Sequence, residues 1–183
     1  MNKRTIALTT EQYKEIIQTM REGFCGCRPN ERIATVLVLE GNLGLRISDI
    51  LSLRLSDIVR DGDRYRLEIT EQKTKKKRVF TVPLVIQQYI ENYCLRNGIG
   101  KTERIFNLTE RAISKQLALV CDYLGFEGIG THSFRKWYAT EIYKNNGYDI
   151  TLVQRLLQHI TQRYIGIEPQ RIEEAIEGHA QLL

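Results

Sequence analysis

The sequence predicts a mainly α-helical fold with one small antiparallel β-sheet, which places it in the α+β class. Apolar residues recur at helical spacing over most of the 183 residues. Threonines that can cap helices precede two of these stretches. One pair of strand-like segments surrounds a highly charged turn. No apolar run is long enough to cross a bilayer, so we expect no membrane association.

Helices follow from the apolar spacing and from the capping residues. Thr9 or Thr10 can cap the first helix and Thr109 a later one, and Pro83 can open a helix at the end of a strand. Trp137 and Tyr138 are predicted to be core aromatic residues, and the FCGCRPN segment is predicted to be a loop. The predicted helices cover residues 10–21, 31–42, 48–55, 83–96, 110–124, 131–144, 150–159 and 168–183.

The sheet is predicted between two of these helices. Asp61-Gly62-Asp63 is a turn signal. Residues 64–70 then alternate charged and apolar side chains, with Tyr65, Leu67 and Ile69 on one face. Residues 79–82 form the return strand. The connecting hairpin, residues 71–78, is crowded with cations. Such a run is usually a solvated tip, but a strand-borne lysine can also enter a DNA groove.

Composition limits the possible functions. The net charge of +5 is mild support for an anionic partner. The four cysteines, Cys25, Cys27, Cys94 and Cys121, lack the paired C-x-x-C spacing of a zinc site, so we expect reduced thiols and no metal. No secretory leader is visible, and a cytoplasmic, nucleoid-associated location in a bacterium or phage is expected. No internal boundary is apparent, so residues 1–183 are expected to form a single domain.

Two arginine-containing motifs suggest phosphate chemistry. Arg46 is followed three residues later by Asp49, which lies on the same face if a helix has begun. A guanidinium held by a carboxylate is usually a structural ion pair, but it is also a natural clamp for phosphate. His132 and Arg135 have i, i+3 spacing. A titratable imidazole beside a fixed cation suits acid–base work at a phosphate.

The order of motifs along the chain is more specific than any one of them. An arginine in GLRISDILSL is followed by a lysine in a hairpin, H-x-x-R in THSFRKWYAT, a histidine in LLQH and a tyrosine in TQRYIGI. This order resembles the tyrosine recombinase, or phage integrase, family from Glu31 to Gly166. The resemblance implies the catalytic-domain fold of that family. It also implies site-specific DNA recombination, by integration, excision or inversion, through a 3′-phosphotyrosyl intermediate.

The resemblance also assigns roles to individual residues. Tyr164 would be the nucleophile, Arg46 and Arg135 would hold the scissile phosphate, and His132 would accept a proton or orient the phosphate. His159 would donate a further hydrogen bond. Lys73 would protonate the leaving 5′ oxygen, with Lys75 as the alternative. Asp49 would hold Arg46 in place. The DNA-binding residues would be Lys75, Lys76, Lys77 and Arg78. No cofactor and no metal are implied, because the phosphotyrosine conserves the bond energy and cations replace Mg²⁺.

One segment departs from the family pattern. His159 and Tyr164 are five positions apart, whereas the family has a longer connection with a serine-rich turn. On an unbroken α-helix five positions turn roughly 140° and rise about 7.5 Å, so the two side chains could not share one phosphate. The backbone breaks here, or Tyr164 is delivered to a neighbouring protomer, or the enzyme is impaired. Our hypothesis is that the shortening blocks or reroutes the tyrosine.

The expected partner is double-stranded DNA, bound by a homo-oligomer that forms a tetrameric synapse. No N-terminal core-binding domain is apparent, so we expect weak and salt-sensitive binding. The helix over residues 168–183 is a candidate for exchange between protomers. Two other functions remain open. One is relaxation of DNA, as by a type IB topoisomerase. The other is binding of DNA by a catalytically impaired protein of the same fold.

Overall fold

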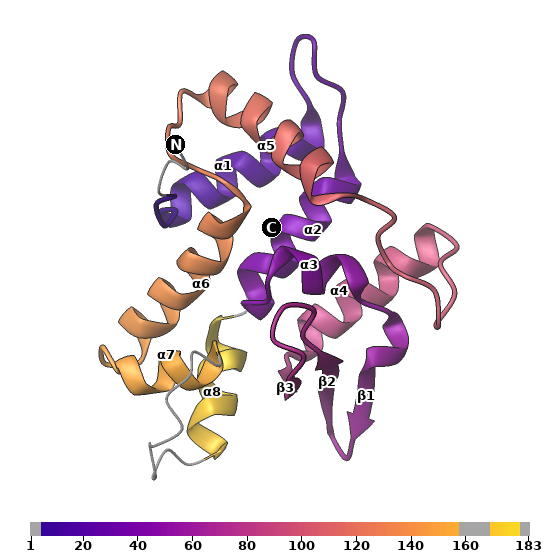
Figure 1. The fold of residues 1–183 in the computed structure, drawn as a ribbon, viewed down its shortest axis with the longest axis vertical. Helices are drawn as coiled ribbons and strands as arrows, with labels where there is room; N and C mark the ends of the chain where they lie inside the picture. The colour runs from indigo at the N-terminus through magenta and orange to yellow at the C-terminus, as the bar shows by residue number, and fades with distance from the viewer. Residues whose placement is uncertain (1–4, 158–168, 180–183) are drawn as a thin grey trace. The chain divides into compact units, whose positions relative to one another are not determined.

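The computed structural model describes residues 5–157 and 169–179 (Figure 1). These residues form two compact units. The first unit consists of residues 5–51 and 106–140. The second consists of residues 52–105, 141–157 and 169–179. Helices dominate both units, and the strands all lie in the second. The predicted class, mainly α with one small antiparallel sheet, is therefore confirmed.

The first unit is helical, and its helices begin where the sequence predicts. They are α1 (Thr10–Glu22), α2 (Glu31–Leu43), α3 (Ile47–Ser52), α5 (Glu110–Leu124) and the start of α6 (Thr131–Asn145). Thr9 caps α1 through a capping box. Its Oγ1 accepts from the Gln12 amide at 3.1 Å, and its own amide donates to Gln12 Oε1 at 3.0 Å. Thr109 caps α5 by accepting from the Ala112 amide. These caps satisfy amides that have no partner within the helix.

The core of the first unit forms around α2, which is buried on almost every face. Tyr13 of α1 stacks on Trp137 of α6 with ring centroids 4.0 Å apart. Trp137 and Tyr138 are fully buried, which confirms their prediction as core residues. The aromatic packing connects α1, α2 and α6, so the backbone of α6 is held firmly in this unit.

The second unit contains the sheet and the helices that follow it. A short 3₁₀ turn, η1 (Leu55–Asp57), leads into β1 (Ile58–Asp61), β2 (Arg64–Thr70) and β3 (Lys77–Val82), which pair antiparallel in the order β1-β2-β3. The helices α4 (Leu84–Arg96), α7 (Ile150–Leu156) and α8 (Pro169–His179) complete the unit. Helix α4 contacts β2, and α8 contacts β3.

The register of the sheet agrees with the predicted faces. Leu67 pairs with Ile58 on one side and with Phe80 on the other. It is completely buried, while Tyr65 and Ile69 on the same face are half-buried. Since alternate residues of a strand point to one face, this places the apolar face of β2 inward.

The structure adds one strand to the prediction and moves the bounds of three elements. β3 begins at Lys77, two residues before the predicted start of the return strand. β1 was not predicted, because its four residues are too few to show an alternating pattern. The helix expected over residues 48–55 ends at Ser52 and is followed by η1. Helix α7 ends at Leu156, three residues before the predicted end. The final helix is found over Pro169–His179, with Ala175 and Ile176 buried as its spacing predicts. The remainder of the predicted range lies outside the described residues or side chains.

The structure also bears on the predictions for the cysteines and for membrane association. All four cysteines are free thiols, and burial raises the pKa of Cys121 to about 11. Among the described residues no helix is both long and apolar enough to span a bilayer.

Candidate functional site

Arg46 and Asp49 follow a tight contact between α2 and α6. Gly44 ends α2 with a left-handed backbone, φ +58°, and a Cβ placed there would lie 2.4 Å from the ring of Tyr138. Only glycine fits both constraints. Arg46 comes two residues later and is half-buried, and its carbonyl accepts the amides of Asp49 and Ile50 as α3 begins. The side chain of Asp49 is 1% exposed. A buried carboxylate one turn after the arginine is what the predicted supporting role requires.

His132 and Arg135 lie in the first two turns of α6. The imidazole of His132 is exposed, whereas Arg135 is 2% exposed and is among the largest buried side chains. The amide of Gly130 donates to Ser133 Oγ at 3.1 Å, which fixes the start of the helix. The structure thus presents the imidazole to solvent and holds the guanidinium deep in the same unit.

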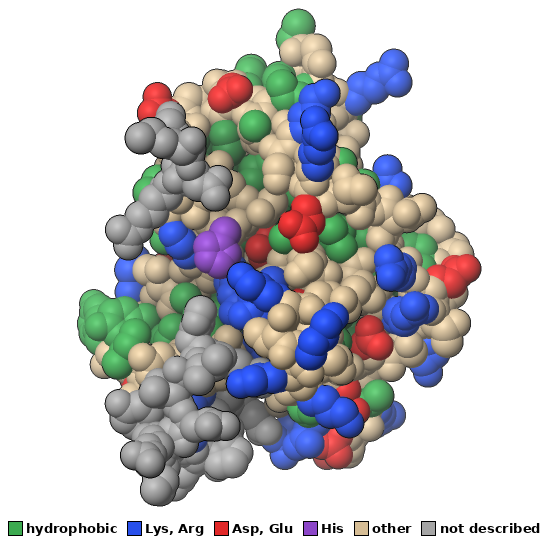
Figure 2. Space-filling model, in the orientation of Figure 1, with side chains coloured by type: hydrophobic (Ala, Val, Ile, Leu, Met, Phe, Trp, Pro, Cys, Tyr) green, Lys and Arg blue, Asp and Glu red, His purple; other side chains and the backbone are tan. Residues whose placement is uncertain are grey.

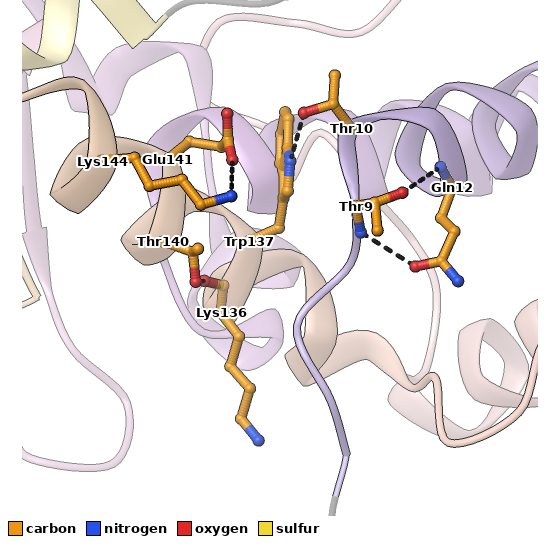
Figure 3. A network of polar contacts seen from close by, with 8 residues as sticks. All are labelled: Thr9, Thr10, Gln12, Lys136, Trp137, Thr140, Glu141 and Lys144. Carbon is orange, nitrogen blue, oxygen red and sulfur yellow. Dashed lines mark hydrogen bonds and ion pairs between the residues drawn. The ribbon is translucent and has the colours of Figure 1, made fainter.

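Side chains of helix α6 also form hydrogen bonds with the N-terminal segment of the chain (Figure 3). Trp137 Nε1 donates to Thr10 Oγ1 at 3.3 Å, and Lys136 Nζ donates to the carbonyl of Thr5. Within the helix, Thr140 Oγ1 donates to the carbonyl of Lys136 at 2.9 Å. These contacts are made by residues that directly follow Arg135 in the helix, so they restrict the backbone from which its side chain projects.

Glu40 is a neighbour of Arg135 that the sequence analysis missed. It lies on α2, one turn before Gly44, and Arg135 lies one turn before Tyr138, which packs on Gly44. Burial raises the pKa of the Glu40 carboxyl well above its usual value, the charge of Arg135 opposes that rise, and Glu110 adds to it. The signal available in the sequence was a lone acid inside the apolar run VLVLEG. Arg135 therefore has a titratable carboxyl within electrostatic range.

The predicted lysine hairpin lies in the second unit. Lys73, Lys75 and Lys76 are exposed between β2 and β3, and so is Lys77, the first residue of β3. Lys75 has a positive φ of 56°. Figure 2 shows Lys and Arg side chains over the sheet, with a few acidic side chains among them. Exposed ammonium groups on a short loop are able to meet a phosphate backbone.

Arg78 departs from the prediction that it binds DNA. Its side chain is 2% exposed, and its guanidinium forms an ion pair with the equally buried Glu71, Nη1 to Oε1 3.7 Å. The alternation of β3 explains the difference, because Lys77 and Val79 point outward and Arg78 points inward. An arginine that is buried in an ion pair with a carboxylate cannot contact DNA. The prediction that Arg78 binds DNA is therefore wrong.

A polar pocket of about 440 Å³ lies beside the hairpin, within the second unit. Besides Arg78, which pairs with Glu71, its cations are Arg54, Lys77 and Arg104, against Asp57 and Glu68. The excess of cations favours an anionic occupant. Among the described residues no group of three His, Cys, Asp or Glu side chains is arranged to hold a metal ion.

The predicted residues that the structure describes are divided between the two units. Arg46, Asp49, His132 and Arg135 belong to the first unit, and the lysines belong to the second. His159 and Tyr164 lie outside the described residues. A buried guanidinium and an exposed imidazole in the first unit, and exposed ammonium groups in the second, are side chains of the kinds that bind phosphodiesters and transfer protons.

Comparison with known proteins identifies the family. Residues 7–171 match the phage integrase family. The chain is similar to "Probable integrase/recombinase YoeC" of Bacillus subtilis (strain 168), with 34% identity over 76% of this chain and 80% of YoeC. It spans only 51% of the tyrosine recombinase XerC of Caldanaerobacter subterraneus subsp. tengcongensis, at 23% identity and 95% coverage of this chain.

Solved structures show the same fold. The XerH site-specific recombinase bound to its difH substrate aligns with a TM-score of 0.65 at 20% identity, covering 87% of this chain and 48% of that one. A lambda integrase tetramer bound to a Holliday junction also gives 0.65, at 22% identity over 90% of this chain and 50% of that one. Together with the family match, these similarities show that the chain belongs to the phage integrase family, the tyrosine recombinases that carry out site-specific DNA recombination.

Proposed function

We propose that this chain is the catalytic domain of a site-specific recombinase that cleaves and rejoins double-stranded DNA through Tyr164. The observation that supports the proposal is the ordered set of Arg46, Lys73, His132, Arg135 and Tyr164 within the residues that match the family. The burial of Arg135 within electrostatic range of Glu40 on α2 supports it further, since a transition-state clamp must be held rigidly.

The proposed reaction is a transesterification. The phenolate of Tyr164 attacks the scissile phosphorus, and His132 takes the phenol proton. Arg46, Arg135 and His159 bind the non-bridging oxygens as charge develops on the pentavalent phosphorus. Lys73 gives a proton to the leaving 5′ oxygen. A 3′-phosphotyrosine results, and the free 5′ hydroxyl of another strand reverses the steps. Because the ester bond energy is kept, the reaction needs no ATP. Because cationic side chains stabilise the charge that develops on the phosphoryl oxygens, it needs no metal ion.

The proposed assembly is a homo-oligomer on DNA, with a tetramer as the synaptic form. The solved relatives include one bound to its DNA substrate and a tetramer on a Holliday junction. Helix α8 is proposed to take part in contacts between protomers. The exposed Lys75 and Lys76 between β2 and β3, and Lys77 at the start of β3, would contribute phosphate contacts.

Covalent trapping tests the proposal. The protein is mixed with nicked duplexes that carry the ends of its own element, the reaction is stopped with SDS, and covalent protein–DNA adducts are resolved by electrophoresis. We expect an adduct that Tyr164→Phe abolishes and Tyr148→Phe retains, because Tyr148 is an exposed tyrosine with no assigned role.

The two other functions give different results in the same experiment. DNA that is bound without any adduct, both in this chain and in a version with a serine-containing segment restored after His159, would indicate a non-catalytic DNA-binding protein. Relaxation of supercoiled plasmids that lack the element's ends would indicate topoisomerase activity. An adduct only in the restored version would indicate a recombinase disabled at its tyrosine connection.

A further inference from the structure

Arg78 is anchored by three different groups in the second unit. Its Nη1 lies 3.7 Å from Glu71 Oε1, and both side chains are 2% exposed. Its guanidinium carbon lies 4.6 Å from the ring centroid of Phe80, in cation–π range. Its Nη2 donates to the carbonyl of Leu156. A desolvated guanidinium with a carboxylate, an aromatic face and a carbonyl around it has little freedom to move.

Glu71, which pairs with Arg78, also holds the lysine loop (residues 71–76) through three hydrogen bonds. Its Oε2 accepts from Thr74 Oγ1 at 2.6 Å. Its amide donates to the carbonyl of Lys76 at 3.0 Å, and its carbonyl accepts from the amide of Lys75 at 2.9 Å. The loop that carries Lys73 is therefore closed around Glu71. Removal of the ion pair would leave a buried carboxylate without its cation at the base of the loop.

The third contact of Arg78 joins the loop to a distant part of the sequence. Leu156 is the last residue of α7, and its carbonyl is one of those that lack a partner within the helix. Arg78 satisfies it. Three residues beyond Leu156 in the sequence comes His159, and Tyr164 follows.

We propose that Arg78 is a positioning residue for DNA cleavage, which fixes the loop bearing Lys73 by tying its base, through Glu71, to the end of α7. This inference rests on the proposed function, in which Lys73 is the general acid. It assigns Arg78 a role inside the fold in place of the DNA contact that its position in a basic run suggested. Since Lys73 must meet the leaving oxygen within hydrogen-bond distance, a loosened loop should slow protonation of that oxygen.

A sulfur-substituted substrate tests the proposal. In one nicked duplex the leaving group is the 5′ oxygen, and in the other sulfur replaces that bridging oxygen. A thiolate leaves without a proton from the enzyme, because thiols are far more acidic than alcohols. We expect Arg78→Lys to cleave the oxygen duplex at least about tenfold more slowly than the unchanged protein, and to regain most of that loss on the sulfur duplex. Lys73→Ala should show the same pattern more strongly.

Arg66→Lys is the matched control. Arg66 lies on the neighbouring strand β2 and forms an ion pair with Asp61 at 2.8 Å, but the two side chains are 40% and 50% exposed, whereas those of Arg78 and Glu71 are buried. We expect this variant to cleave both duplexes like the unchanged protein. Equal losses on both duplexes in Arg78→Lys, or no loss on either, would overturn the proposal. Glu71→Gln provides a second variant with the same expected pattern, should Arg78→Lys fail to fold.

Hydrogen exchange separates this proposal from the proposed function. In the DNA-free protein, the Lys75 amide should exchange faster in Arg78→Lys than in Arg66→Lys, because its acceptor is the Glu71 carbonyl. If the unchanged protein forms no adduct with DNA, the proposed function fails, but faster exchange at Lys75 would still support the tie between Arg78 and the loop. Unchanged exchange would contradict that tie even in an active enzyme.

Discussion

At the scale of single residues, Glu40 beside Arg135 makes the clearest prediction for stability. Burial raises the pKa of the Glu40 carboxyl well above its usual value, so the folded protein holds the proton more tightly than the unfolded chain does. As the pH rises from the ordinary glutamate pKa toward the folded one, the unfolded chain loses this proton first. The free energy of unfolding should therefore fall across that pH range.

Glu40→Gln should remove this fall, because glutamine has no proton to release. We expect the variant to match the unchanged protein near pH 4, below the ordinary glutamate pKa, and to be the more stable of the two at pH 8. Each unit of raised pKa corresponds to about 1.4 kcal/mol. Urea unfolding at several pH values measures the difference, with Glu15→Gln on the exposed face of α1 as control. A difference between Glu40→Gln and the unchanged protein that is constant with pH would refute the prediction.

At the scale of elements, we expect the lysines in and next to the loop between β2 and β3 to have two separate roles. Lys73 should act in DNA cleavage, and the lysines that follow it should act in DNA binding. Lys75 and Lys76 of this loop, and Lys77 directly after it at the start of β3, are exposed and are proposed to bind phosphates. Replacing all three with alanine should lower DNA affinity. It should also reduce the slope of log K against log salt by about 0.9 for each phosphate that the variant no longer neutralises. Cleavage from the saturated complex should change little.

Lys73→Ala should do the reverse, with cleavage slower by about 10²–10⁴-fold and affinity lowered by at most the share of a single phosphate. Fluorescence anisotropy at several salt concentrations and single-turnover cleavage measure the two effects. Lys101→Ala, an exposed lysine outside this loop, is the control for charge alone. If the triple variant and Lys73→Ala lose affinity and cleavage in the same proportion, the division of roles is incorrect.

Elements with local signals were predictable from the sequence, and features that depend on distant contacts were not. Thr9 and Thr109 indicate the starts of α1 and α5, because a cap needs only the next three residues. The inward direction of Arg78 could not be inferred, because in the sequence it is the last cation of a basic run. Its burial depends on Glu71 across the loop and on Leu156, 78 positions away.

The residues of the candidate site also differ in whether the sequence alone could identify them. Motif order was enough to select Arg46, His132 and Arg135, because the resemblance depends on residue identity. Glu40 was not selected, because its approach to Arg135 depends on how α2 packs against α6. That packing requires Gly44 to sit against Tyr138, a contact between positions far apart in the chain.

At the scale of the whole molecule, the question is which protomer's site receives Tyr164. The five-residue separation of His159 and Tyr164 is too short for an unbroken helix to bring both to one phosphate. Exchange between protomers in a closed ring would resolve this, because each tyrosine would then serve the neighbouring site. In such a ring the cations that bind a phosphate and the tyrosine that attacks it belong to different chains.

Mixing two inactive variants tests this arrangement. Tyr164→Phe keeps the phosphate-binding residues but has no nucleophile, and Arg135→Lys keeps the nucleophile but loses the two-pronged clamp of arginine. If the tyrosine crosses to a neighbour, the mixture should form a covalent adduct that neither variant forms alone, and the DNA should be attached to the Arg135→Lys chain. A size tag on one variant identifies that chain by electrophoresis. If the mixture stays inactive while the unchanged protein forms adducts, each site uses its own Tyr164. The backbone must then depart from a helix between His159 and Tyr164 to bring the nucleophile to the phosphate.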